Sequence, residues 1–320
     1  MRVIVTGGAG FIGSHVVDAL LDEGHEVVVV DDLSSGRERN LNAKARFERV
    51  DIVDAAALER TFAAFEPEVV CHQAAQTSVS VSTREPVRDA STNVIGSINV
   101  LEACVRHRVG RLIFASTGGA IYGEVAEPKL AKVGDATVPL SPYACSKLAV
   151  EHYIACWQAA HGLHATVLRY ANVYGPRQDP HGEAGVVAIF SERLLSALPC
   201  RINAKKDVGD DGCIRDYVAV ADVVKANLLA VHGKLGDTTI NVCTGVPATT
   251  LQIAEGLMKS LAIEASLERG PWRPGDLERS VLDATEMRTK IGEPTSLDVG
   301  LARTAKWFRE QHDALQRNAD

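Results

Sequence analysis

A glycine-rich turn near the start of the chain constrains the fold more than any other feature. The segment Thr6–Gly13, with the sequence TGGAGFIG, follows the β-branched run Val3–Thr6 and opens a segment with helical spacing, Phe11–Asp22. Glycines allow a tight turn and let the backbone approach a diphosphate, whose charge then meets the unpaired N–H groups of the helix N-terminus. The pattern therefore predicts the first half of a dinucleotide-binding βαβ unit.

An acidic residue at the end of the next strand indicates which dinucleotide binds. Asp31 closes the apolar run Glu26–Asp31, where the dinucleotide fingerprint places a carboxylate. This carboxylate can accept hydrogen bonds from the adenosine ribose hydroxyls, and it would repel a 2′-phosphate. The sequence therefore predicts NAD rather than NADP as the cofactor. Arg37, which lies nearby, is the one residue that argues for NADP.

Strands and helices alternate through the first half of the chain. The further predicted strands are Arg46–Asp51, Pro67–Ala75, Arg111–Thr117 and Ala165–Tyr170, and the further helices lie near 55–65, 87–107 and 142–161. Strands that are apolar almost throughout are buried on both faces, as in a parallel sheet covered by helices. The predicted fold class is α/β, a doubly wound parallel Rossmann sheet.

The alternation weakens after about Ala171, where loops rich in Gly, Pro and Asp begin. These loops are Tyr174–Gly185, Asp207–Gly212 and Gly270–Asp276. We expect an NAD-binding domain over 1–171 with return segments near 213–243. A smaller, mostly C-terminal substrate domain would comprise 172–212 and 244–320, with an amphipathic helix near 298–312, and would cover the carboxyl ends of the strands.

Composition and charge exclude several classes of protein. The chain of 320 residues has 34 basic and 41 acidic residues and a net charge of −7, which argues against nucleic acid or a membrane surface as a partner bound through bulk charge. The seven cysteines form no CxxC pair, so we expect reduced thiols in a cytoplasmic protein and no metal site. We also expect no secretory signal and no span long enough to cross a bilayer.

A tyrosine followed one helical turn later by a lysine is the clearest candidate for catalysis. Tyr143 and Lys147 follow Pro142, which suits the first turn of a helix, so both side chains should lie on one helical face. An ammonium beside a phenol stabilises the phenolate and makes tyrosine a usable general base near neutral pH. A YxxxK match also arises by chance, but of the six tyrosines only Tyr143 has a lysine at this spacing.

The fifth predicted strand ends in two hydroxyl side chains. Ser116 and Thr117 stand at the carboxyl end of Arg111–Thr117, and this end of a strand in a parallel sheet faces the ligand crevice. Thr117 could hydrogen-bond the oxygen whose proton Tyr143 removes, with Ser116 as the second candidate. The alternative is that Thr117 is an ordinary threonine whose hydrogen bond stabilises the strand end.

With these residues in place, the chain resembles the extended short-chain dehydrogenase/reductase family and, within it, the UDP-hexose (UDP-glucose/UDP-galactose) 4-epimerase group. The resemblance covers nearly the whole chain. It rests on Thr6–Gly13, Asp31–Gly36, Asp51-Ile52, His72–Gln76, Asn93, Ser116–Gly123, Tyr143 with Lys147, Arg169–Pro176, Arg215–Tyr217 and Arg273–Asp276.

The resemblance implies a set of NAD-binding positions. Asp51 and Ile52 would flank the adenine, and Tyr170 and Val173 would lie near the nicotinamide. The full set comprises Gly7, Gly10, Phe11, Ile12, Gly13, Asp31, Asp32, Leu33, Ser34, Ser35, Gly36, Asp51, Ile52, Gln73, Ala74, Ala75, Gln76, Asn93, Ser116, Tyr143, Lys147, Tyr170 and Val173.

The resemblance also implies a UDP-sugar site. Arg215 and Arg273 would clamp the diphosphate, which suits guanidinium groups on general grounds, and Asp276 would contact the uridine ribose. Either arginine alone could instead form a surface salt bridge. The implied substrate-binding residues are Thr117, Gly118, Gly119, Tyr143, Asn172, Val187, Arg201, Asn203, Arg215, Arg273, Asp276 and Ser280.

The implied reaction is an epimerisation through a transient 4-keto sugar, with no net redox change. The related nucleotide-sugar dehydratases carry an Asp-Glu pair after the catalytic threonine, and the decarboxylases a nearby glutamate; Gly118 and Gly119 stand there in this chain and favour plain epimerisation. A UDP-glucuronate 4-epimerase is an alternative function that the sequence leaves open. A non-catalytic NAD-sensing protein is a weaker alternative, because such proteins typically lose the Tyr–Lys pair.

Two finer expectations come from the resemblance. Ser280 occupies the position that is large and aromatic in epimerases restricted to glucose and galactose, so the pocket should have room for a 2-acetamido group. The long helices near 87–107 and 142–161 would pair two copies of the chain into a homodimer.

Overall fold

The structure is a computed structural model that describes residues 1–181, 185–273 and 275–317. Some predicted segments include positions outside these ranges. Pro274 belongs to the predicted motif Arg273–Asp276 and to the predicted loop Gly270–Asp276, and residues 182–184 belong to the predicted loop Tyr174–Gly185.

A seven-stranded sheet with parallel pairing throughout forms the centre of the larger unit. Its strand order is β10-β6-β5-β4-β1-β2-β3, so the chain leaves β1 first toward one edge and then toward the other. The strands are β1 (Arg2–Thr6), β2 (Glu26–Asp31), β3 (Arg46–Arg49), β4 (Val69–His72), β5 (Arg111–Thr117), β6 (Ala165–Tyr170) and β10 (Thr239–Val242). This order confirms the predicted doubly wound sheet and opens a crevice between the carboxyl ends of β1 and β4.

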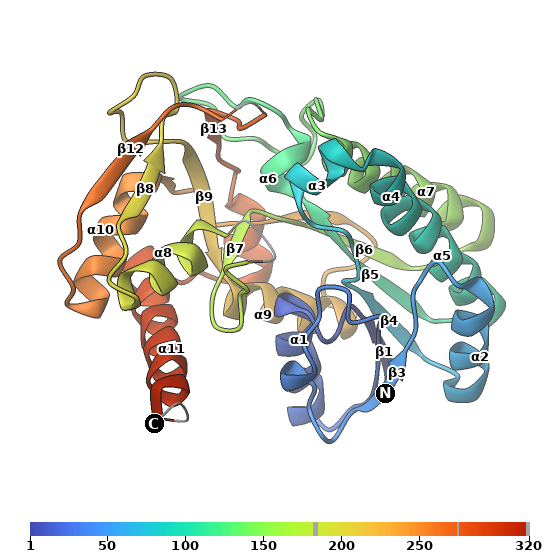
Figure 1. The fold of residues 1–320 in the computed structure, drawn as a ribbon. Helices are drawn as coiled ribbons and strands as arrows, with labels where there is room; N and C mark the ends of the chain where they lie inside the picture. The colour runs from blue at the N-terminus through green and yellow to red at the C-terminus, as the bar shows by residue number, and fades with distance from the viewer. Residues whose placement is uncertain (182–184, 274, 318–320) are drawn as a thin grey trace.

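Helices cover both faces of this sheet (Figure 1). Alternate residues of β1 point to opposite faces: Val3 and Val5 belong to one core cluster and Ile4 to another. One face carries α1 (Phe11–Asp22) and α9 (Val220–Val231), and the other carries α2 (Ala55–Phe65), α5 (Gly96–Arg106) and α7 (Pro142–His161). Burial on both faces explains why β1 and β2 consist almost entirely of β-branched residues.

The predicted helix near 87–107 forms with one irregular turn. It consists of α4 (Pro86–Ala90), a π turn over Ser91–Ile95 and α5, and the short α3 (Val79–Arg84) precedes it. The predicted helices near 55–65 and 142–161 have the bounds of α2 and α7. The observed β3 and β4 are shorter than the predicted strands, and the residues that follow them, Val50–Ile52 and Gln73–Ala75, line the pocket.

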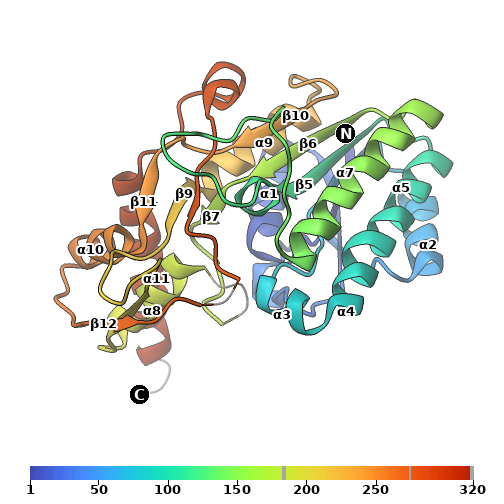
Figure 2. The ribbon, with the colours of Figure 1, turned by 90° about the horizontal axis from the view of Figure 1, so that it is seen from above.

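A smaller unit lies over the carboxyl ends of the strands (Figures 1 and 2). One of its sheets has the order β11-β9-β13 with β7 also paired to β9, and the other pairs β8 with β12. These strands are β7 (Asn172–Tyr174), β8 (Cys200–Asn203), β9 (Ile214–Ala219), β11 (Pro247–Thr249), β12 (Leu267–Gly270) and β13 (Arg279–Ser280). Helices α8 (Val186–Leu195), α10 (Thr250–Leu261) and α11 (Leu297–Arg317) enclose a third core cluster with them.

The return segment predicted near 213–243 divides between the two units. Strand β10 belongs to the seven-stranded sheet, and helix α9 covers one face of that sheet. Strand β9 instead pairs with β7, β11 and β13 of the smaller unit. The remaining short elements are α6 (Gly118–Ile121), a 3₁₀ turn over Glu38–Asn40 and a π turn over Met287–Ile291. Within the described ranges, every helix is too short or too polar to cross a membrane.

Candidate active site

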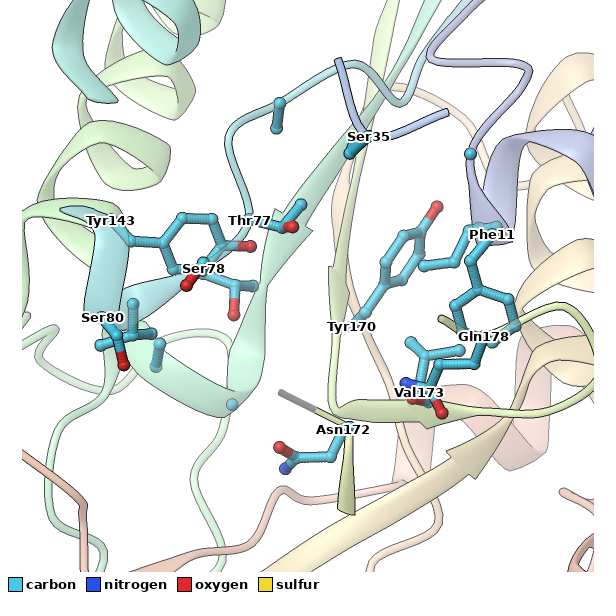
Figure 3. A pocket seen from close by; sticks show the side chains of 18 of the residues that line it. Phe11, Ser35, Thr77, Ser78, Ser80, Tyr143, Tyr170, Asn172, Val173 and Gln178 are labelled. Atoms are coloured by element: carbon cyan, nitrogen blue, oxygen red, sulfur yellow. Dashed lines mark hydrogen bonds between the residues drawn. The ribbon is translucent and has the colours of Figure 1, made fainter. Parts of the chain in front are cut away.

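One continuous pocket of about 1020 Å³ runs along the carboxyl edge of the central sheet and under the smaller unit. Its lining begins at the glycine turn and at Asp31, passes Tyr143 and Lys147, and ends at arginines of the smaller unit. Figure 3 shows its middle part, with Tyr143 on one side and Tyr170 on the other. The pocket is therefore long enough to hold two ligands end to end, with the tyrosine–lysine pair where they would meet.

The glycine turn leaves no room for side chains. Gly7 has φ +69°, and a Cβ there would lie 2.6 Å from the backbone nitrogen of Ala74. A Cβ at Gly13 would lie 2.1 Å from the carbonyl oxygen of Gly7. Helix α1 begins after Gly10 without a side-chain cap, so its first N–H groups stay available to a ligand. This geometry fits a diphosphate at the helix N-terminus.

Asp31 is held at the end of β2 by two backbone groups. Its carboxylate accepts hydrogen bonds from the N–H groups of Ala9 at 3.0 Å and Leu33 at 2.8 Å. Burial raises the pKa of Asp31 above its ordinary value, and these two hydrogen bonds oppose that shift. A Cβ at Gly36 would lie 2.6 Å from Asp31 Oδ1, which explains the glycine in this turn. The carboxylate lines the pocket where an adenosine ribose would lie.

Arg37, the residue that argued for a 2′-phosphate, has an acidic partner in the structure. Its Nη2 lies 2.6 Å from Asp179 Oδ2, and it does not line the pocket in the described parts of the chain. A guanidinium that is already paired with a carboxylate is a weak site for a second anion. The structure thus supports the choice of NAD that Asp31 predicts.

Helix α7 positions the tyrosine and the lysine. Ser141 caps the helix by accepting a hydrogen bond of 3.2 Å from the Ala144 N–H, and Pro142 occupies the first turn. Tyr143 therefore stands at the start of the helix, and its side chain lines the pocket (Figure 3).

Lys147 lies one turn further along α7 and is buried. Its Nζ donates a hydrogen bond of 2.9 Å to the carbonyl oxygen of Ala115 in β5. Burial lowers the pKa of Lys147 to about 8, while the carboxylates of Asp89 and Glu151 oppose this shift. At neutral pH the lysine carries its proton and faces the pocket as a cation.

The other tyrosines of the pocket are poor candidates for a base. Tyr170 accepts a hydrogen bond of 2.8 Å from Asn227 and donates one of 3.3 Å to Gln73, and burial raises its pKa. Burial also raises the pKa of Tyr174, and it raises that of Tyr217 to about 12. Among these pocket tyrosines, Tyr143 alone has a lysine one turn away on its own helix.

Of the two hydroxyls at the end of β5, the serine is already engaged. Ser116 donates a hydrogen bond of 2.5 Å to Glu151, and Glu151 forms a buried ion pair of 2.5 Å with Arg169. Thr117 is the last residue of the strand and lines the pocket. The arrangement favours Thr117 as the hydroxyl that meets a substrate oxygen.

Three predicted arginine positions contribute to the far end of the pocket. Arg201 and Arg215 come from β8 and β9, and Arg273 from the loop after β12. The Arg215 guanidinium donates hydrogen bonds of 3.0 Å and 2.7 Å to the carbonyl oxygens of Ile214 and Leu277, which fix its plane. Arg273 is two-thirds exposed and lies 3.6 Å from Asp276. This group of cations suits a diphosphate.

Most of the predicted site residues line this pocket, and six do not. Leu33 and Gly36 shape the turn around Asp31, and Gly118 packs against Leu282, to which a Cβ would come within 2.5 Å. Ser280 lies behind the wall, where its Oγ donates a hydrogen bond of 3.0 Å to the Gly119 carbonyl. The positions outside the lining are Leu33, Gly36, Gln76, Asn93, Gly118 and Ser280.

Gln76 and Asn93 belong to a buried network behind the tyrosine–lysine pair. The Asn93 amide donates a hydrogen bond of 3.0 Å to Ser146 and one of 3.1 Å to Asp89, and the Gln76 amide donates one of 2.8 Å to Asp89. Asp89 is 1% exposed, so it is a buried carboxylate close to the pocket wall. Asn93 thus orders the segment behind the pocket.

Some lining residues were not foreseen from the sequence. The segment after β4 contributes Thr77, Ser78, Val79, Ser80, Thr83 and Arg84, and the smaller unit contributes Gln178, Arg193, Cys213 and Glu268. The strand-end rule that selected Thr117 would also have selected Thr77 and Ser78, had it been applied after β4. The second group depends on pairing between distant strands, which no local pattern shows.

These features define the class of the protein: an α/β enzyme with a dinucleotide cradle and a tyrosine–lysine pair in one pocket. More particularly, the chain belongs to the NAD dependent epimerase/dehydratase family, which residues 3–243 match. This result agrees with the resemblance seen in the sequence motifs.

Individual relatives cover almost the whole chain. The UDP-glucose 4-epimerase of Mycolicibacterium smegmatis is 44% identical over an alignment 319 residues long, which covers 97% of this chain and 99% of the relative. The structure of the Thermus thermophilus UDP-glucose 4-epimerase in complex with NAD matches with a TM-score of 0.93 at 48% identity, covering 97% of this chain and 99% of that one. The Thermotoga maritima UDP-glucose 4-epimerase with UDP-glucose gives a TM-score of 0.91 at 47% identity, with the same coverage.

Proposed function

We propose that the chain is an NAD-dependent isomerase, a UDP-hexose 4-epimerase that interconverts UDP-glucose and UDP-galactose. The observation that carries this proposal is the order of groups along one pocket. The glycine turn and Asp31 lie at one end, Tyr143 and Lys147 in the middle, and Arg215 and the other cations at the far end. Relatives that are nearly half identical over the full length carry this activity in their names.

The residues present fit NAD at the first end. The Gly7–Gly13 turn would hold its diphosphate at the N-terminus of α1, and Asp31 would bind the adenosine ribose hydroxyls. When bound, NAD supplies a reversible acceptor for the hydride at C4 of the sugar. All other parts of the reaction fall to side chains of this chain.

Tyr143 and Lys147 handle the proton. Tyr143 removes the proton of the sugar 4-hydroxyl as C4 is oxidised, and returns it when C4 is reduced on its opposite face. The buried ammonium of Lys147 stabilises the tyrosinate, and Thr117 donates a hydrogen bond to the same substrate oxygen. A 4-keto sugar forms and is consumed within one turnover, so the products are the two C4 epimers.

The strand end argues against a dehydratase. Loss of water across C5 and C6 needs an acid and a base close to those carbons. Gly118 and Gly119 follow Thr117 here, and among the described residues the carboxylates that line the pocket come from the cofactor end and from the smaller unit. They are Asp31, Asp32, Asp51, Glu268 and Asp276. Plain epimerisation is the chemistry that the remaining groups support.

The small side chain of Ser280 supports the proposal that the enzyme accepts sugars other than glucose and galactose. Gly119 lines the pocket opposite Asn172, and a Cβ at Gly119 would lie 3.4 Å from the Asn172 amide nitrogen. Ser280 backs this wall with a small, buried side chain that is bonded to Gly119. Because the wall at this point consists of a glycine backed by a serine, we propose that 2-acetamido sugars are accepted as well.

Assembly and location complete the proposal. Val87, Ile95 and Tyr153, on the adjacent helical segments α4–α5 and α7, are 78%, 50% and 38% exposed. Apolar side chains exposed on neighbouring helices favour pairing with a second copy, so we propose a homodimer through this face. All seven cysteines are free thiols, which supports a cytoplasmic location.

A substrate panel tests the activity. Purified enzyme with NAD would be given UDP-galactose, UDP-GalNAc, UDP-glucuronate and dTDP-glucose, with product analysis by chromatography. The proposal expects 4-epimers from the first two. A 4-keto-6-deoxy product from dTDP-glucose as the main reaction would contradict it, and turnover confined to UDP-glucuronate would replace it with a uronate epimerase.

A further inference from the structure

Two helices of the larger unit end beside one another, at the edge of the sheet opposite the pocket. Glu23 is the C-cap of α1 and His232 is the C-cap of α9, and the two helices lie side by side in both views (Figures 1 and 2). His25 stands in the turn between α1 and β2. The C-terminal end of a helix carries a partial negative charge, so two such ends together favour a cation.

Three potential ligand atoms converge at this place. His232 Nε2 lies 2.8 Å from Glu23 Oε2, and His25 Nε2 lies 3.4 Å from the same oxygen. All three atoms lie within 4.8 Å of one another. In a tetrahedral site with metal–ligand bonds of about 2.0–2.1 Å, ligand atoms are separated by about 3.3 Å. Small side-chain adjustments would therefore bring the three atoms to one metal ion.

His25 has the less exposed side chain of the two histidines in this cluster, and one of its ring nitrogens lacks a hydrogen-bond partner among the described residues. The His25 side chain is only 10% exposed, and its Nε2 has no hydrogen-bond partner in the described chain. Its other ring nitrogen, Nδ1, lies 3.2 Å from the nitrogen of Met1. Nε2 is thus the nitrogen that faces the cluster; because the Met1 ammonium donates to Nδ1, Nε2 binds a metal ion only after losing its own proton.

We propose that Glu23, His25 and His232 form a binding site for a divalent transition-metal ion such as Zn²⁺, with water as the fourth ligand. Two imidazole nitrogens and one carboxylate suit Zn²⁺, Co²⁺ or Ni²⁺ and disfavour Ca²⁺ and Mg²⁺, which prefer oxygen. The expectation of no metal site rested on cysteine spacing and did not consider this cluster. The ion links the end of α1 to the end of α9, so it stabilises the fold and takes no part in turnover.

Cobalt binding tests the site directly. Full-length enzyme treated with a chelator and then dialysed would be titrated with Co²⁺. We expect one equivalent to give visible d–d absorption, without the near-ultraviolet thiolate band that the exposed Cys145 or Cys156 would produce. Zn²⁺ should displace the Co²⁺ and raise Tm. Absence of a visible band and of a Tm shift with 100 µM metal would overturn the proposal.

Variants locate the site. His232→Gln and His25→Gln should each weaken Co²⁺ affinity at least tenfold, and epimerase activity should be unchanged. His161→Gln is the matched control, because His161 is an exposed histidine in the last turn of α7. Since His232 is the more exposed ligand, His232→Gln should fold even if His25→Gln does not. Wild-type affinity in folded His232→Gln, or an equal loss in His161→Gln, would overturn the proposal.

Discussion

Lys147 Nζ donates a hydrogen bond of 2.9 Å to the backbone carbonyl of Ala115, and the lysine is buried in the wall of the pocket. The charged and titratable groups around it are His72, Asp89 and Glu151, besides Tyr143 on its own helix. Glu151 is already paired with Arg169, and burial lowers the pKa of His72 to about 3, so this imidazole is neutral. Asp89 is therefore the buried carboxylate that is left to balance the charge of the lysine.

This balance predicts the pH dependence of turnover. The pKa of Lys147 is lowered to about 8, so the ammonium is present below that pH and is lost as pH rises through it. We expect kcat to fall on the alkaline side of about pH 8. Asp89→Asn removes a carboxylate that raises the pKa of Lys147, so its alkaline limb should move to lower pH. Glu102→Gln, an exposed acid on α5, is the control. An unmoved limb in Asp89→Asn would contradict this role.

The same buried lysine also makes the stability of the fold depend on pH. This contribution to stability increases as pH rises, whereas turnover is expected to fall. The pKa of Lys147 in the folded protein is below the ordinary value of about 10.4, so the unfolded chain binds the proton more tightly between about pH 8 and pH 10. The burial penalty of the charged lysine is relieved over this range, and this one contribution to stability rises with pH. Lys147→Met should therefore show a smaller gain in Tm from pH 8 to pH 10 than the wild type. An identical gain in both proteins would exclude this contribution.

The two arginines at the far end of the pocket should contribute unequally to substrate binding. Loss of a charge-assisted hydrogen bond costs about 1.5–3 kcal/mol, or roughly 10- to 100-fold in affinity. Arg215→Ala should raise KM for UDP-galactose within this range, and Arg273→Ala should do so less, because only Arg215 is fixed by backbone carbonyls. Steady-state kinetics decide this, with exposed Arg303→Ala as control. Equal KM values in all three variants would contradict a diphosphate site.

The pocket wall at Gly119 predicts a switch in sugar range. Ser280→Tyr places a large ring against Gly119 and so reduces the space at this wall of the pocket. Turnover of UDP-GalNAc should therefore fall at least tenfold, while turnover of UDP-galactose should stay within a few-fold of the wild-type value. Ser280→Ala should keep both activities. Both rates would be measured on variants whose Tm shows that they are folded. A parallel loss of both substrates in a folded Ser280→Tyr protein would mean that Ser280 does not set the sugar range.

The exposed apolar face predicts how copies assemble. Ile95→Glu places a charge in the middle of the proposed interface and should convert a dimer to a monomer, as measured by light scattering after size-exclusion chromatography. Val246 is 54% exposed but lies on the smaller unit, so Val246→Glu is the matched control and should stay dimeric. A monomeric wild type, or a dimer that survives Ile95→Glu, would place the interface elsewhere or remove it.

Local patterns in the sequence predict the cofactor half of the site well and the substrate half less completely. The cradle at Gly7–Gly13, the carboxylate of Asp31 and the pair on α7 each depend on one strand, turn or helix, so periodicity and capping residues reveal them. The far end depends on β9, which pairs with three strands distant in sequence. Ser280 shows the limit: its sequence position suggested a pocket residue, and the structure places it one layer behind Gly119.

The central claim is that the C4 hydrogen leaves as a hydride and returns to the same carbon, while Tyr143 moves only the hydroxyl proton. Epimerisation of UDP-galactose in D₂O, in the presence of NAD, tests this most directly by NMR. The account predicts UDP-glucose that retains protium at C4, with turnover reduced at least 100-fold in Tyr143→Phe. Deuterium at C4 of the product, or full activity in Tyr143→Phe, would contradict it.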